Sequence, residues 1–165
     1  MSNENRLNSA ATDGLLLSTI TIVASLIQST FKIDSMIIAS LLWLMKFGGC
    51  IYLLHWCMNR QSLSSGGSSY MDSFKYGFLV CAFSSIVCAG YMLLSLTLLF
   101  PEQTNMIIEQ ATKIMEQGNY SSEEKAAFDS LSVRLPQLTS MTSFVYYVII
   151  GAVMSSVIAN FTKKE

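Results

Sequence analysis

Four long apolar stretches, separated by more polar segments, divide the chain. They occupy about 13–31, 36–58, 74–100 and 138–161. A helix needs about 20 mostly apolar residues to cross a bilayer, and each stretch is close to or above that length. A helix of a soluble bundle would carry a polar face at the helical period, but FLVCAFSSIVCAGYMLLSLTLLF in the third stretch has none. The pattern therefore predicts an all-α membrane protein with four transmembrane helices.

The connections between these stretches differ in length and composition. The first is the short segment KIDS at 32–35, which predicts an antiparallel hairpin of the first two helices. The second is rich in serine and glycine, and Gly66-Gly67 is a turn signal. The third, about 101–137, is long and acidic, and it predicts a helical insert before the last span.

Two helical patterns follow each other in the insert. In PEQTNMIIEQATKIMEQGN the apolar positions fall on one helical face, namely Ile107, Ala111, Ile114 and Met115. Pro101 suits the first turn of this helix, and Gly118-Asn119 suits its C-terminal end. Ser121 and Glu124 have the spacing of a capping box, which predicts the start of a second helix that Pro136 ends. The apolar stripe of this second helix is Ala127, Phe128, Leu131 and Leu135. We expect an amphipathic helical hairpin outside the hydrocarbon layer.

Composition agrees with a membrane protein that forms a single integral membrane domain over 1–165. Hydrophobic residues make up 52% of the chain and charged residues 13%, whereas soluble domains average about 25% charged residues. The formal net charge is −1, and no basic segment is interleaved with aromatic residues. The sequence therefore gives no support for a nucleic-acid partner.

Lysine and arginine near the helix ends predict the orientation of the spans. With four spans, both termini and the serine- and glycine-rich connection share one side of the membrane. That side carries Arg6, Arg60, Lys75, Lys163 and Lys164. The other side carries Lys32 in a short connection, and Lys113, Lys125 and Arg134 in a long segment that also holds six acidic residues and counts less. The positive-inside rule then predicts a multi-pass inner-membrane protein with cytoplasmic termini and an extracytoplasmic hairpin. The polar N-terminus lacks the pattern of a signal peptide, so we expect the first span to be retained.

Lys46 is the most unusual residue of the second stretch, in SLLWLMKFGGCIYLLHW. A lysine at the bilayer centre costs roughly 2.5–3.5 kcal/mol on insertion scales. No acidic residue is expected inside the spans, because Asp13, Asp34 and Asp72 are predicted to lie at their ends. Three possibilities remain for Lys46. Its amine bonds to backbone carbonyls and hydroxyls of neighbouring helices, or it is neutral and needs no counter-ion, or it pairs with an anion from outside the chain.

Arg60 lies fourteen residues, or two heptads, after Lys46 and therefore shares its helical face. Both residues are therefore candidates for contact with a lipid, another anion or a second subunit. His55 points to the opposite face and lies beside Trp56, so we interpret it as an interfacial anchor.

Small residues recur at helical spacing and predict close helix packing. The candidates for this interface are Gly49, Gly77, Cys81, Ser84, Cys88, Gly151, Ser155 and Ala159. Packing inside the bundle is the simpler interpretation, and a homo-oligomer interface is the alternative. The four cysteines form two pairs seven residues apart, about 10 Å along a helix, which is too far to chelate one ion. We therefore expect reduced thiols, no metal and no cofactor.

The order of these features resembles a family of small bacterial membrane proteins known as domain of unknown function 4199, found mainly in Bacteroidetes-type bacteria. The similar features are the short first hairpin, RQS followed by GG after the second span, DSFKYGFLVCAF, the insert, and the ending IANFTKKE. The resemblance assigns no activity to any residue. Members of the family are often thought to be encoded near genes for membrane-associated glycosyltransferases, so the resemblance implies a role in envelope glycan or lipid-linked sugar metabolism.

The sequence contains no phosphate-binding loop, no HExxH motif and no Ser/His/Asp set, so we expect no catalysis by this chain. The leading hypothesis is a non-catalytic accessory or scaffold protein that binds membrane lipids and a partner membrane protein such as a glycosyltransferase. The alternative is a small transporter or flippase-like carrier of an anionic lipid or sugar phosphate, with Lys46 as its anion contact. An enzyme that uses His55 and the cysteines ranks last.

Overall fold

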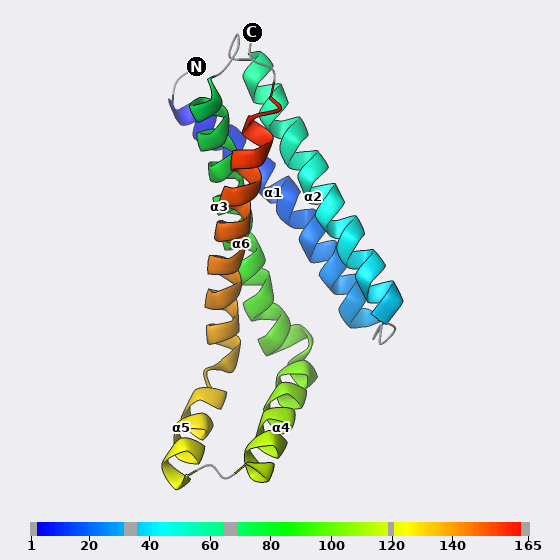
Figure 1. Ribbon diagram of the computed structural model, residues 1–165, viewed down its shortest axis with the longest axis vertical. Coiled ribbons are helices and arrows are strands. Elements are labelled where there is room, and N and C mark those ends of the chain that lie inside the picture. Colours follow the sequence, from blue (N-terminus) through cyan, green and yellow to red (C-terminus); the bar gives the residue numbers. More distant parts are fainter. Residues whose placement is uncertain (1–2, 32–35, 65–68, 119–120, 163–165) are drawn as a thin grey trace. The chain divides into compact units, whose positions relative to one another are not determined.

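The computed structural model describes residues 3–31, 36–64, 69–118 and 121–162. Within these ranges the chain forms six α-helices and one π-helix, and no strand (Figure 1). In chain order they are α1 (Asn3–Thr30), α2 (Met36–Ser64), α3 (Tyr70–Leu94), η1 (Ser95–Leu99), α4 (Pro101–Gln117), α5 (Ser122–Ser132) and α6 (Leu135–Ala159). The predicted turn at Gly66 and Gly67, the connection 32–35, Asn119 and the two C-terminal lysines lie outside the described residues.

Four helical segments of the described chain are long and apolar enough to cross a membrane: Asn5–Thr30, Met36–Ser64, Tyr70–Leu99 and Leu135–Ala159. Their outer faces carry large apolar side chains, and Met36 and Ile37 are more than 80% exposed. Exposing so much apolar surface to water costs free energy, whereas contact with hydrocarbon does not. These faces therefore suit the interior of a bilayer. The predicted all-α chain with four apolar spans is therefore confirmed.

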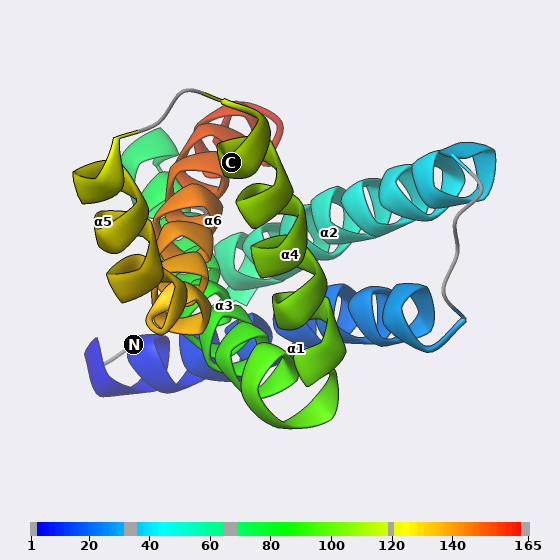
Figure 2. The ribbon, with the colours of Figure 1, turned by 90° about the horizontal axis from the view of Figure 1, so that it is seen from below.

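The structure consists of two compact units, residues 1–88 with 144–165, and residues 89–143. In the first unit α1 and α2 run side by side as an antiparallel pair (Figures 1 and 2). Arg6 at the start of α1 donates a 2.6 Å hydrogen bond to the carbonyl of Asp72 at the start of α3. The hydroxyl of Tyr70 lies 2.9 Å from that of Ser156 near the end of α6. These contacts bring both ends of the chain's helical part to the same end of the unit.

The core of the first unit collects side chains from all four helices. Ala10 of α1, Met58 of α2, Tyr76 of α3 and Ala159 of α6 are almost completely buried there. Helix α1 approaches α3 very closely at Gly14, where a β-carbon would lie 2.8 Å from the carbonyl oxygen of Val80. Only glycine permits this approach, so Gly14 sets the distance between the two helices.

Helix α1 begins about ten residues earlier than the hydrophobic pattern predicted. The polar segment after Asn3 is helical because part of it packs against the bundle: Ala10 and Asp13 have no exposed surface. The prediction that the spans contain no acidic residue is consequently wrong, since Asp13 lies well inside α1. The pattern of apolar residues missed this because an ion-paired carboxylate can be buried in a membrane helix.

The second unit contains the end of α3, η1, α4, α5 and the beginning of α6. Ser140 of α6 donates a 2.8 Å hydrogen bond to the carbonyl of Ala89 on α3. The wider π-helix η1 ends with a bond from the Phe100 amide to the Ser95 carbonyl. Thr104, buried in α4, donates a 3.1 Å bond to the carbonyl of Leu96 and so joins α4 to η1.

The two helices of the insert agree with their predicted start signals. Pro101 lies in the first turn of α4, and Ser121 with Glu124 forms the capping box of α5, both as predicted. Pro136 differs from the prediction, because it lies in the first turn of α6, while α5 already ends at Ser132. Proline is well suited to a first turn, where its missing amide hydrogen has no helical partner to lose.

Candidate functional site

The buried carboxylate of Asp13 joins three helices of the first unit. Arg60 Nη2 of α2 donates a 2.7 Å hydrogen bond to Asp13 Oδ1 of α1. The second carboxylate oxygen, Asp13 Oδ2, accepts a 2.7 Å hydrogen bond from the hydroxyl of Tyr76 on α3. The Asp13 side chain is completely buried, whereas that of Arg60 is half exposed. Both oxygens of the buried carboxylate are therefore satisfied, as a buried charge requires.

Two further residues of α2 contact this ion pair. The guanidinium of Arg60 lies 4.8 Å from the centre of the Trp56 ring, in a cation–π arrangement. The thiol of Cys57, which is fully buried, lies beside Asp13. Arg60 was predicted as a contact for a lipid, another anion or a second subunit. The structure gives it an anion within the chain, because opposite charges on the antiparallel helices α1 and α2 meet at the same level.

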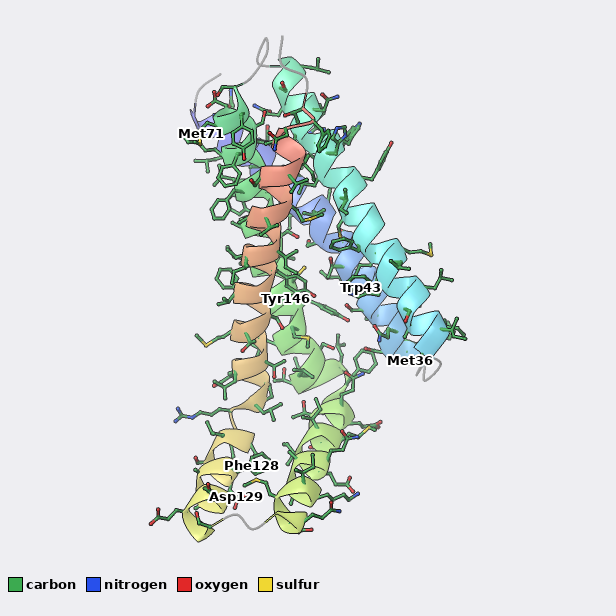
Figure 3. The ribbon with its side chains drawn as sticks, in the orientation of Figure 1. Met36, Trp43, Met71, Phe128, Asp129 and Tyr146 are labelled. Carbon is green, nitrogen blue, oxygen red and sulfur yellow. The ribbon has the colours of Figure 1, made fainter. Side chains whose placement is uncertain are left out.

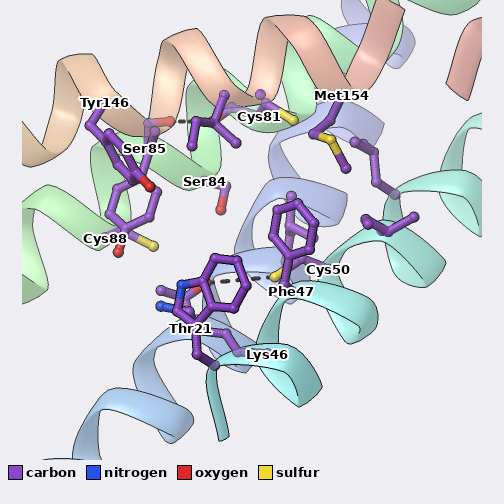
Figure 4. Close-up of a pocket in the computed structure, with 17 residues that line it drawn as sticks. Thr21, Lys46, Phe47, Cys50, Cys81, Ser84, Ser85, Cys88, Tyr146 and Met154 are labelled. Atoms are coloured by element: carbon purple, nitrogen blue, oxygen red, sulfur yellow. Dashed lines mark hydrogen bonds between the residues drawn. The ribbon is translucent and has the colours of Figure 1, made fainter. Parts of the chain in front are cut away.

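A cavity of about 140 Å³ lies farther along the same four helices. Figure 4 shows its lining. The wall residues that carry polar or sulfur groups are Thr21, Lys46, Cys50, Cys81, Ser84, Ser85, Cys88, Tyr146, Tyr147 and Met154. The rest of the wall is apolar or aromatic. One polar contact crosses the cavity wall from α1 to α2, where Thr21 Oγ1 lies 3.8 Å from Cys50 Sγ.

Lys46 contributes the cation of this cavity and is partly buried in its wall. Along the axis of α2, Lys46 lies ten residues, about 15 Å, after the start of the helix at Met36. The end of the helix at Ser64 lies eighteen residues, about 27 Å, farther on. Its amine forms no hydrogen bond or ion pair with any residue in the part of the chain that the structure describes. Bonds to carbonyls and hydroxyls of neighbouring helices were one of the three possibilities for Lys46, and the described residues provide none.

Lys46 and Arg60 occupy separate sites although they share a helical face. Arg60 is about 21 Å from Lys46 along α2, and it does not line the cavity. His55 lies outside the cavity wall as well. The same helix therefore carries one cation that is paired within the chain and one that faces a cavity.

The predicted small residues meet at the contact of α3 with α6. A β-carbon added to Gly151 would overlap the side chain of Cys81, and one added to Gly77 would lie 3.0 Å from Ser155 Oγ. Cys81 Sγ and Ser155 Oγ are 3.7 Å apart. The two small-residue seams thus face each other inside the first unit.

The other predicted packing residues lie nearby but have different neighbours. Ser84 and Cys88 line the cavity rather than the seam. Gly49 faces Ile20 of α1, with room for a β-carbon at an ordinary 3.6 Å. Ala159 is fully buried in the core.

All four cysteines are free thiols. Cys50, Cys81 and Cys88 line the cavity, whereas Cys57 lies against Asp13. Among the described residues, no three side chains of His, Cys, Asp or Glu converge in the way a metal site requires.

Comparison with known proteins places this architecture in a family. A family described as "Protein of unknown function (DUF4199)" matches residues 12–164, which is nearly the whole chain. The chain belongs to this family. The predicted membership in domain of unknown function 4199 is thereby confirmed. No curated protein and no solved structure matches the chain.

Sequence reasoning missed several residues of the two sites. Asp13 was interpreted as the boundary of an apolar stretch, and Tyr76 and Thr21 were not considered. A usable signal was present, because Asp13 begins one apolar stretch and Arg60 follows the next, so antiparallel packing brings their opposite charges together. The aromatic residues Trp43 and Tyr146 gave no such signal, since aromatic residues are common along apolar helices.

Proposed function

We propose that this protein is a non-catalytic accessory protein of the membrane that binds an anionic group at the Lys46 cavity. The observation that carries this proposal is Lys46, which lines a cavity far from either end of a membrane-spanning helix and has no counter-ion among the described residues. A lysine retained at such a position normally has a partner, because its unpaired charge is costly in hydrocarbon.

The nearby ion pair supports this interpretation by contrast. The chain supplies Asp13 as the counter-ion of Arg60 and adds Tyr76 as a second donor. No comparable group is supplied to Lys46 by the described residues. The cavity instead leaves space next to Lys46 that an anion from outside the chain would fill.

Binding to a partner protein is the second part of the proposal. The lipid-bound chain would assist a membrane enzyme of lipid-linked sugar or envelope glycan metabolism, such as a glycosyltransferase. This part rests on the absence of catalytic motifs in the sequence and on the family resemblance. Affinity purification from native membranes, with mass spectrometry of lipids and proteins, tests it; recovery of the chain with no reproducible protein partner contradicts it.

A carrier of anionic lipids or sugar phosphates remains the second candidate, since it would use the same cation. The cavity lined by four spanning helices favours it. Reconstituted vesicles distinguish the two functions: a carrier moves a labelled anionic lipid between leaflets at a Lys46-dependent rate, whereas an accessory protein binds without transport.

The anion site itself is tested by the exchange Lys46→Gln. In detergent, anionic lipids should raise the melting temperature of the wild-type chain, and this shift should be lost in Lys46→Gln. Lys75→Gln is the matched control, because Lys75 is an exposed lysine of α3 outside the cavity wall. Equal shifts in all three proteins would contradict the proposal.

We further propose a bacterial inner-membrane location with cytoplasmic termini and the α4–α5 insert outside the cytoplasm. The excess of lysine and arginine on the side of the termini supports this orientation. Alkaline phosphatase fused after Gly118 should then be active, and the same enzyme fused to the C-terminus inactive. The reverse result would invert the topology.

A further inference from the structure

The Lys46 cavity has an opening between α2 and α6. Trp43 of α2 and Tyr146 of α6 both line the cavity, yet they are 52% and 53% exposed. A side chain that lines a cavity and also remains half exposed borders the mouth of that cavity. Figure 3 shows Trp43 and Tyr146 on the sides of α2 and α6 that face each other. We refer to the mouth bordered by these two residues as the lateral opening.

The surface around the lateral opening is apolar. Leu44, which lies with Trp43 in a surface depression of α2, is 58% exposed, and Ile149, one turn after Tyr146 on α6, is also 58% exposed. Both helices are membrane spans, and Lys46 is about 15 Å from the nearer end of α2. The lateral opening therefore faces the lipid phase, and a ligand that uses it comes from within the bilayer.

The interior of the cavity combines one charge with an apolar wall. Lys46 is its cation, and Thr21, Ser84 and the two tyrosines add hydroxyl groups. The volume of about 140 Å³ is close to that of a cavity of about 150 Å³, which holds a benzene-sized molecule. A single small anion matches this size and charge, whereas a nucleotide or a large glycan headgroup exceeds the volume.

We infer that the ligand is a membrane lipid with a small phosphate headgroup, which enters through the lateral opening and pairs its phosphate with Lys46. Its hydrocarbon chains stay outside the cavity, against the exposed apolar faces of α2 and α6. This inference rests on the proposed anion-binding function and specifies its ligand. A soluble phosphate has the same anion but lacks the chains that hold a lipid at an opening in the bilayer.

Trp43 reports directly on this site. The chain has two tryptophans, so Trp56→Phe leaves Trp43 as the single indole and keeps an aromatic ring beside Arg60. The variant in detergent micelles is titrated with short-chain phosphatidic acid, with the diacylglycerol of the same chains, and with inorganic phosphate. We expect a saturable change of Trp43 fluorescence with phosphatidic acid and little change with the other two at equal concentration.

Charge variants complete the test. Lys46→Gln should weaken the apparent affinity for phosphatidic acid about tenfold or more, as expected for loss of a charge-assisted contact. Lys46→Arg keeps the charge and should retain binding, which guards against a variant that fails to fold. Lys75→Gln should titrate like the parent protein.

Each contrary result has a separate meaning. If inorganic phosphate saturates the site with the same dependence on Lys46, the lipid inference is overturned while the proposed anion site stands. If diacylglycerol acts as strongly as phosphatidic acid, the chains rather than the phosphate are recognised, and the inference is again overturned. If neither anion gives a response that depends on Lys46, both the inference and the proposed function fail.

Discussion

Asp13 and Arg60, 47 residues apart in sequence, are joined by a hydrogen bond of 2.7 Å between a fully buried carboxylate and a half-exposed guanidinium. This ion pair connects α1 to α2, and Tyr76 extends it to α3. It differs from the Lys46 cavity in how its charges are balanced. The charges of the ion pair are balanced within the chain, so we assign it to stability rather than to binding.

Asp13→Asn should destabilise the protein. The exchange removes the counter-ion of Arg60, and loss of one partner of a buried pair costs roughly 3–5 kcal/mol. Because the guanidinium is half exposed and can turn to solvent, we expect a smaller loss of about 1–3 kcal/mol. Unfolding in mixed micelles measures it, with Asp72→Asn, at a half-exposed aspartate, as the control. Equal stability of Asp13→Asn and wild type would show that the pair contributes nothing.

Tyr76→Phe removes one hydrogen bond and leaves the packing of the ring in place. The hydroxyl of Tyr76 is a donor to a charged oxygen, so its loss should lower the free energy of unfolding by about 1.5–3 kcal/mol. The same unfolding experiment measures this. In the double variant with Asp13→Asn the two losses should not add, because both act on one carboxylate. Full additivity would contradict a direct bond.

Alanine should have opposite effects at two glycines of the spans. A β-carbon at Gly151 would overlap Cys81, so Gly151→Ala should cost about 1–3 kcal/mol. A β-carbon at Gly48 meets no described heavy atom within 4 Å, and alanine there should stabilise the helix by up to about 1 kcal/mol. Melting temperatures in one detergent compare the variants. A stabilising Gly151→Ala would mean that α3 and α6 are not in contact there.

Glu109 and Lys113 form a surface ion pair of 2.7 Å one turn apart on α4. The hydrogen bond and the charge of Lys113 lower the pKa of Glu109 from its ordinary value, and Glu109 in turn raises the pKa of Lys113. The contribution of Glu109 is present above its unfolded pKa and is lost as pH falls through the lowered folded pKa. That of Lys113 is present below its unfolded pKa and is lost as pH rises through the raised folded pKa.

The pair should therefore support α4 between acidic and strongly basic pH. NMR titration of the Glu109 carboxyl carbon measures the effect: in Lys113→Gln the pKa of Glu109 should rise towards its ordinary value. Arg134→Gln, which removes a different cation from the same segment, should leave it unchanged. A Glu109 pKa that does not respond to Lys113→Gln would show that the pair is absent in solution.

The helical insert illustrates how local signals predict structure. Pro101 and the Ser121–Glu124 capping box were recognised in the sequence because each acts within one turn of helix. The face of α4 was harder to assign. Ile107 and Ile114 belong to its predicted apolar stripe, yet they are 45% and 63% exposed. Periodicity identifies which residues share a face, but it does not say what that face contacts.

The sequence by itself determined the four apolar spans, the helical insert and the unusual position of Lys46, because hydrophobicity and helix start signals act locally along the chain. Only the tertiary structure decided which polar groups are paired. Asp13 meets Arg60 and Tyr76, whereas Lys46 meets a cavity, because these contacts depend on the relative rotation and close approach of helices distant in sequence. Because a buried charge is costly without a partner, this difference separates a cation that is paired within the chain from one that has no partner among the described residues.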